Sequence, residues 1–246
     1  MIIAPDKTVD AILQVLGSID PPDGLCKGRA SRLYDRVIAK DMTEVSEIVA
    51  EARKTKGPIL ELAVGSGRIT GPLLALGRPL TAVDSSPEVS VRFEVDGGFG
   101  CVVLGASFIT LLDPADRREL FRRVRECLTP DGRFLMTVLN ADTHQASETN
   151  DGGTSVSALG DDSCLITRES RDAVNGARHV TMIHVSFNEG GTYRSSEYAT
   201  DVPFVSSRLL EEEISAERLN IIERRPVHIV TPTDGLNDVE LWVCGK

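Results

Sequence analysis

Two acids and two glycines have the types and the spacing that could hold a nucleotide-like ligand. Glu61 lies in a short apolar run, and Gly65 and Gly67 follow it before a segment with helical spacing. This order predicts a strand, a tight turn and a helix start, where the backbone can approach a ligand closely and N–H groups are unpaired. A second apolar run, residues 79–83, ends at Asp84, which is placed to accept both hydroxyls of an adenosine ribose.

A dinucleotide site would have a similar outline, so the details of the turn discriminate between ligands. The dinucleotide fingerprint G-x-G-x-x-G would place its third glycine at position 70, where this chain has Thr70. Glu61 also lies inside the predicted strand, before the glycines. A nicotinamide-dependent oxidoreductase is therefore disfavoured, and NADH binding is the observation that would revive it.

Three segments follow one another in the order of a known family's motifs. They are residues 61–67 (ELAVGSG), 82–88 (AVDSSPE) and 128–135 (LTPDGRFL). Together they resemble the class I S-adenosylmethionine (SAM)-dependent methyltransferases, in their glycine-rich first motif, their ribose-binding second strand and the turn into their fifth strand. The resemblance covers residues 34–139. It implies an α/β fold with a Rossmann-like sheet, SAM as cofactor and S-adenosylhomocysteine (SAH) as product.

The resemblance also implies which positions contact the cofactor. These are Tyr34, Glu61, Ala63, Gly65, Ser66, Gly67, Asp84, Ser85, Leu104, Gly105, Ala106 and Ser107. Glu61 would anchor the glycine turn and reach the methionine end of SAM, and Asp84 would hold the ribose. The small residues 105–107 would let a loop pass between the methyl group and the substrate, although a turn that merely needs small residues is the alternative. The alternative for Tyr34 is an ordinary core residue of an amphipathic helix.

The chain departs from the family between its second and fourth strands. Only about 15 residues separate Asp84 from the predicted fourth strand at residues 100–104, and a single crossover needs about a dozen or more. A complete helix, third strand and second helix cannot fit. Either the third strand, which lies at the sheet edge in this family, is shortened or missing, or the sequence lacks residues. No position can be matched to the family's adenine contacts.

The rest of the chain is predicted to frame this core as a single methyltransferase domain over residues 1–246. Helical spacing predicts an N-terminal helical cap at 1–57, in which residues 21–24 end the first helical unit, and the SAM-binding core follows at 58–140. Residues 141–204 are predicted to form a lid, with a polar loop to residue 162 and then an antiparallel meander of three extended stretches. Asp113, directly before Pro114, predicts the cap of a helix in the core. Ser206 or Ser207 predicts the cap of a later helix with Leu209 facing inward, and this helix and a closing hairpin complete the chain at 205–246.

The composition limits which partners and which cellular compartment we expect for this protein. The net charge of −10 argues against a nucleic-acid substrate, because phosphate backbones need a basic footprint. The arginines of residues 117–125 fit the solvated face of an amphipathic helix.

No apolar run approaches the length of a membrane span, and the first residues lack a secretion signal. The five scattered cysteines predict reduced thiols and no metal site. A cytoplasmic protein follows, and the lid of similar enzymes implies a possible homodimer.

Methyl transfer from a sulfonium is an in-line displacement, so positioning can supply much of the catalysis and a base is needed only for some acceptors. His144, beyond the predicted fifth strand, is the first candidate for a base or an orienting group, with a solvated loop histidine as the alternative. We expect transfer to a nitrogen or oxygen atom of a small molecule or short peptide. Overall resemblance favours secondary-metabolite or peptide tailoring, as in daptide-type peptide methyltransferases. A non-catalytic scaffold of the same fold is the alternative.

Overall fold

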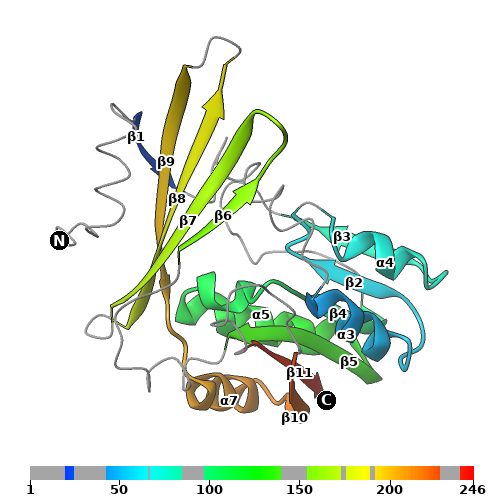
Figure 1. The fold of residues 1–246 in the computed structure, drawn as a ribbon. Coiled ribbons are helices and arrows are strands. Elements are labelled where there is room, and N and C mark those ends of the chain that lie inside the picture. Colours follow the sequence, from blue (N-terminus) through cyan, green and yellow to red (C-terminus); the bar gives the residue numbers. More distant parts are fainter. Residues whose placement is uncertain are drawn as a thin grey trace. The chain divides into compact units, whose positions relative to one another are not determined.

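A computed structural model describes residues 20–24, 43–65, 67–84, 97–139, 154–172, 176–188, 192–227 and 239–246 (Figure 1). The chain divides into two compact units. One comprises Ile38–Glu148 with Pro203–Lys246, and the other comprises Met1–Val37 with Thr149–Val202. The first unit contains the glycine turn and both acids that the sequence singles out.

A six-stranded sheet forms the centre of the first unit, in the order β10-β11-β5-β4-β2-β3. Its strands are β2 (Ile59–Leu62), β3 (Leu80–Val83), β4 (Phe99–Leu104), β5 (Leu128–Leu139), β10 (Asn220–Pro226) and β11 (Val239–Gly245). The four strands from β3 to β5 run parallel, and β11 and β10 close the sheet as antiparallel neighbours. This arrangement confirms the predicted Rossmann-like α/β class.

Helices cover both faces of this sheet, as buried parallel strands require. They are α3 (Thr43–Ala52), α4 (Thr70–Leu74), α5 (Pro114–Cys127) and α7 (Ser207–Ala216), with a short 3₁₀ helix η1 (Phe108–Leu111). Alternate residues along the strands point to opposite faces. Leu60 and Val102 therefore join α5 and α7 in one apolar cluster, whereas Ile59 and Val103 join α3 and α4 in the other.

The predicted helix caps are confirmed. Asp113 accepts hydrogen bonds from the N–H groups of Ala115 and Asp116, both at 2.8 Å, at the start of α5. Ser206 accepts from the N–H of Leu209 at 3.2 Å at the start of α7. These bonds satisfy N–H groups that the first helical turn leaves unpaired.

Two side chains on these helices have the opposite burial from the one predicted. Arg117, predicted on the solvated face of α5, is buried, and its guanidinium donates to the Glu213 carboxylate at 2.7 and 2.8 Å and to the Leu112 carbonyl at 2.8 Å. Leu209, expected to face inward from α7, is 40% exposed. A pairing between α5 and α7 explains the first case, because a buried arginine is tolerated where a carboxylate meets it.

The sheet edge beyond β3 is where a third strand of the family would lie. In the described part of the chain β3 is the last strand on this side, and residues 85–96 lie outside the described residues. Gly100, in β4, lies against the segment that leads into β2. A Cβ at this position would lie 1.5 Å from the Lys56 carbonyl oxygen, so only glycine fits there.

The second unit is a five-stranded sheet in the order β1-β9-β8-β7-β6. Its strands are β1 (Asp20–Gly24), β6 (Thr154–Ala158), β7 (Ser163–Asp172), β8 (Ala177–Phe187) and β9 (Tyr193–Pro203). The antiparallel β6–β7 and β7–β8 pairs confirm a meander, but two edge strands differ from the prediction. β6 lies where a polar loop was expected, and β1, parallel to β9, lies where residues 21–24 were expected to end a helical unit. Edge strands tolerate polar residues and prolines, which hides them in a sequence.

No helix in the described ranges is long and apolar enough to cross a membrane.

Candidate active site

The residues that directly follow β2, β3 and β4 lie at the carboxyl ends of neighbouring parallel strands (Figure 1). This is the edge where ligands of open α/β sheets bind. Ala63, Ala106 and Ser107 adopt positive φ angles of 54°, 58° and 50°, and they are three of the four described non-glycine residues that do so. Such strain persists where the surroundings impose it, and it often marks a functional site.

The glycine turn after β2 is held to the end of β3. Gly65 and Gly67 have φ angles of 52° and 77°, in the left-handed region that favours glycine. The N–H of Gly67 donates to the Val64 carbonyl at 2.9 Å, which closes the turn. The N–H of Gly65 donates to Oδ2 of Asp84 at 2.5 Å. Asp84 is exposed, so this carboxylate stands at the strand end and fixes the turn beside it.

Glu61 is a buried acid with an unsatisfied oxygen. The residue is 2% exposed, and its Oε2 has no hydrogen-bond partner among the described residues. Burial raises the pKa of Glu61, and the nearby Thr70 hydroxyl and Arg68 guanidinium oppose that rise without cancelling it. Oγ1 of Thr70 also lacks a hydrogen-bond partner in the described part of the chain, so Thr70 does not donate to Glu61 in this geometry. A buried carboxylate in this state is suited to receive a donor from a ligand.

Glu44, in the first turn of α3, was not predicted as a site residue. Its carboxylate forms an ion pair with Arg68, which follows the glycine turn, and both of its oxygens accept from the N–H of Ala106, at 2.9 and 3.0 Å. The residue is 6% exposed. In the sequence it resembles any first-turn helix acid, so only the fold reveals its contacts.

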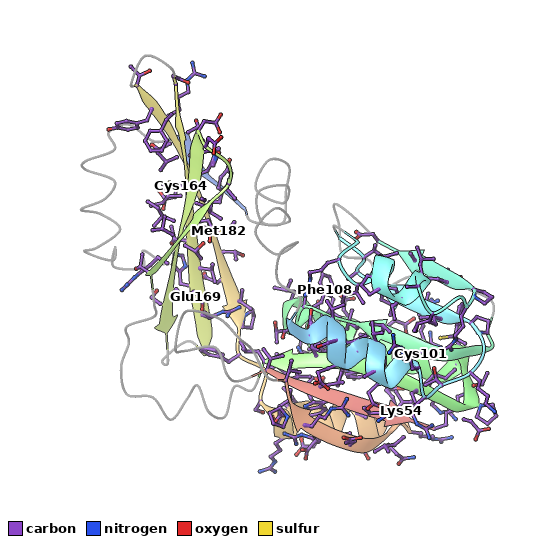
Figure 2. All side chains as sticks on the ribbon, turned by 45° about the vertical axis from the view of Figure 1, so that its right-hand side comes forward. Lys54, Cys101, Phe108, Cys164, Glu169 and Met182 are labelled. Carbon is purple, nitrogen blue, oxygen red and sulfur yellow. The ribbon has the colours of Figure 1, made fainter. Side chains whose placement is uncertain are left out.

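The loop after β4 is held from two sides. The N–H of Ser107 donates to Oγ1 of Thr137, a fully buried residue of β5, at 3.1 Å. Gly105 packs closely under Ile69, since a Cβ there would lie 2.3 Å from Cδ1 of Ile69 and would force that side chain to shift. Phe108, labelled in Figure 2, begins η1 directly after this loop and packs against the apolar cluster of α5 and α7.

The buried charges at this edge do not balance. Glu44 and Glu61 are acids, and Arg68 is a base that pairs with Glu44 and also interacts electrostatically with Glu61, so the three groups in their ionised forms carry one net negative charge. Glu44 already pairs with Arg68, whereas Oε2 of Glu61 has no partner among the residues that the structure describes. A buried charge is stable when it is paired, so this arrangement favours a ligand with a cationic group near Glu61.

The structure brings together most of the predicted cofactor contacts. Glu61, Ala63, Gly65, Gly67, Asp84, Leu104, Gly105, Ala106 and Ser107 lie in β2, in β4 or in the residues directly after β2, β3 and β4. Tyr34, Ser66, Ser85 and His144 lie outside the described residues. Glu44, Arg68 and Thr137 were missed, because their roles depend on contacts between distant segments. The described ranges contain no group of three or more His, Cys, Asp or Glu side chains that could hold a metal ion.

Comparison of the sequence with known proteins finds one short match among curated proteins. No family model matches the chain. An rRNA adenine N-6-methyltransferase of Corynebacterium diphtheriae is 31% identical over 72 residues, which are 29% of this chain and 28% of that protein. The matched segment is therefore less than a third of this curated relative.

Comparison with solved structures is far more extensive. A glycopeptide N-methyltransferase complexed with SAH is 22% identical, with 98% of each chain covered and a TM-score of 0.63. A sugar N-methyltransferase from Streptoalloteichus sp. is 15% identical, with 94% of this chain and 98% of that chain covered and a TM-score of 0.65. The chain therefore has the fold of the class I SAM-dependent methyltransferases.

Proposed function

We propose that this chain, with its class I methyltransferase fold, is a SAM-dependent methyltransferase that acts on a nitrogen or oxygen atom of a small molecule or short peptide. The observation that carries the proposal is the buried Oε2 of Glu61 beside the glycine turn, which has no hydrogen-bond partner in the described part of the chain. SAM is cationic at its ammonium and its sulfonium, so it supplies the positive charge that this edge of the sheet lacks.

The residues present fit this cofactor. Glu61 would accept from the ammonium, and Asp84 would hold the ribose hydroxyls while its Oδ2 stays bonded to the Gly65 N–H. Gly65 and Gly67 let the backbone approach closely, since neither carries a Cβ. When bound, SAM supplies a methyl group that passes to the acceptor's lone pair as the carbon–sulfur bond breaks. Gly105 and the residues after it would then hold the acceptor in line with that bond.

A nitrogen acceptor in a tailored metabolite or peptide is the favoured case. The solved structures that share the fold include glycopeptide and sugar N-methyltransferases. These acceptors are those of the neighbouring proteins, and they support the proposal by analogy. The net charge of −10 opposes binding to rRNA, the substrate of the short curated match. A homodimer stays a proposal that rests on the family resemblance.

We also place the protein in the cytoplasm, where thiols stay reduced. Cys101, Cys127 and Cys244 are free and buried. Burial raises the pKa of these thiols to about 12, about 11 and about 12, which keeps them protonated and inert.

The acceptor class can be tested by SAH production. The purified chain is incubated with SAM and with amino sugars, small amines, short peptides, phenols or an rRNA transcript, and SAH is quantified by mass spectrometry. We expect SAH to accumulate with a small amine, amino sugar or peptide and the product to gain one methyl group. Methylation of the transcript alone would contradict the proposed acceptor class, and SAM binding without turnover of any acceptor would favour the scaffold alternative.

A further inference from the structure

Glu44 connects two loops that the proposed reaction would use. Its carboxylate pairs with Arg68, directly after the glycine turn, and accepts from the N–H of Ala106 with both oxygens. The side chains of Glu44 and Arg68 are 8% and 7% exposed, so water does not compete strongly for these bonds. One buried side chain thus sets the distance between the turn after β2 and the loop after β4.

The loop after β4 needs such support. Ala106 and Ser107 are consecutive residues with φ angles of 58° and 50°, a conformation that is costly for residues with a Cβ. Each of their N–H groups is held by a buried side chain, Ala106 by Glu44 and Ser107 by Thr137. Gly105 packs against the end of the Ile69 side chain, which would have to shift to admit a Cβ. The conformation is therefore imposed by its surroundings.

We propose that Glu44 is a positioning residue for methyl transfer, which holds the loop of residues 105–107 at a fixed separation from the glycine turn. The proposal rests on the proposed function, in which one loop binds the methyl donor and the other faces the acceptor. An in-line displacement depends steeply on the separation and alignment of donor and acceptor. Loss of the Ala106 bond should therefore slow transfer more than it weakens cofactor binding.

Glu44 also lies in a buried ion pair, so a single substitution would mix positioning with stability. Glu44→Leu takes the buried carboxylate away from Arg68, which destabilises the protein whatever the loop does. The double variant Glu44→Leu/Arg68→Met removes both charges and restores an apolar contact, yet it leaves the Ala106 N–H without its acceptor. Arg68→Met alone is the control for the loop, because Glu44 keeps its bond to Ala106 there. This control also breaks the buried ion pair, so we expect it to melt below the wild type and the double variant.

The experiment measures three quantities in the wild type, Arg68→Met and the double variant. These are the melting temperature, amide hydrogen exchange of the peptide that contains Ala106 and Ser107, and the kcat of methyl transfer with the KM for SAM. We expect the double variant to melt near the wild type. We also expect its Ala106 amide to exchange at least about tenfold faster than in Arg68→Met, and its kcat to fall about 10- to 100-fold below that of Arg68→Met with a smaller change in KM.

Each result has a defined meaning. If the double variant and Arg68→Met share the same kcat and the same exchange rate at Ala106, Glu44 has only a structural role and the proposal is wrong. Exchange is measured on the ligand-free protein, so a faster Ala106 amide supports the loop anchor even where no acceptor is turned over. Failure of the wild type to bind SAH would instead contradict the proposed function and leave the exchange result intact.

Discussion

Replacing Glu61 with glutamine is expected to weaken SAM binding by about 2–5 kcal/mol while it stabilises the ligand-free protein. Glu61 is 2% exposed and its Oε2 has no partner among the described residues, so the ligand-free fold bears the cost of a buried carboxylate. Glutamine keeps the shape and removes the charge. Affinity and stability should therefore change in opposite directions, which a simple packing defect would not produce.

The measurements are calorimetric titration with SAM and thermal melting without ligand. Glu212→Gln is the matched control, since Glu212 lies on α7 with its side chain 61% exposed. If Glu61→Gln and the wild type are both folded and bind SAM with equal affinity, Glu61 is not part of the cofactor site.

The raised pKa of Glu61 gives this prediction a pH dependence. In the folded, ligand-free protein the carboxyl takes up a proton at a higher pH than it does in the unfolded chain. As the pH falls through the raised pKa, the folded state therefore binds more protons and gains stability. The same protonation removes the charge that would meet the cofactor's ammonium, so affinity should decrease as the pH falls. Glu61→Gln should flatten both trends, and an unchanged pH profile in this variant would contradict the assignment.

Arg117→Met is expected to destabilise the fold by about 3–5 kcal/mol, the usual cost of leaving one partner of a buried ion pair uncompensated. Arg117 and Glu213 have side chains only 4% and 9% exposed, and two hydrogen bonds join them between α5 and α7. The double variant Arg117→Met/Glu213→Leu should recover most of this loss, because no buried charge is left unpaired.

Urea denaturation of the three proteins measures this effect. Arg122→Met is the control, since Arg122 pairs with Glu119 and Glu126 on the surface of the same helix and should cost less than about 1 kcal/mol. A loss in Arg117→Met no larger than that of the control would show that the α5–α7 pair does not hold this face of the sheet.

Local patterns in the sequence predict the core of this fold well. The glycine turn between β2 and α4, the strand that ends at Asp84, and the caps at Asp113 and Ser206 all depend on residues close in sequence. Short-range rules of turn and cap chemistry are therefore enough to find them. The same rules misplaced Arg117, because its carboxylate partner lies 96 residues away.

The parts of the candidate site that were missed share this long-range origin. Glu44 meets Ala106 across 62 residues, and Ser107 meets Thr137 across 30. Neither contact leaves a periodic signal, since Glu44 resembles an ordinary first-turn acid and Thr137 lies in an apolar strand. Edge strand β6 was missed for another reason, because its polar residues are typical of loops.

Titration of the full-length protein with SAH by calorimetry tests the central claim most directly. We predict binding in the micromolar range, weakened by about 1.5–3 kcal/mol in Asp84→Asn, because a hydrogen bond to a charged group is worth that much. Binding would establish the cofactor site at the carboxyl ends of β2, β3 and β4 despite the short connection after Asp84. No binding by a demonstrably folded protein would contradict the methyltransferase assignment and favour a scaffold that has kept the fold without the cofactor.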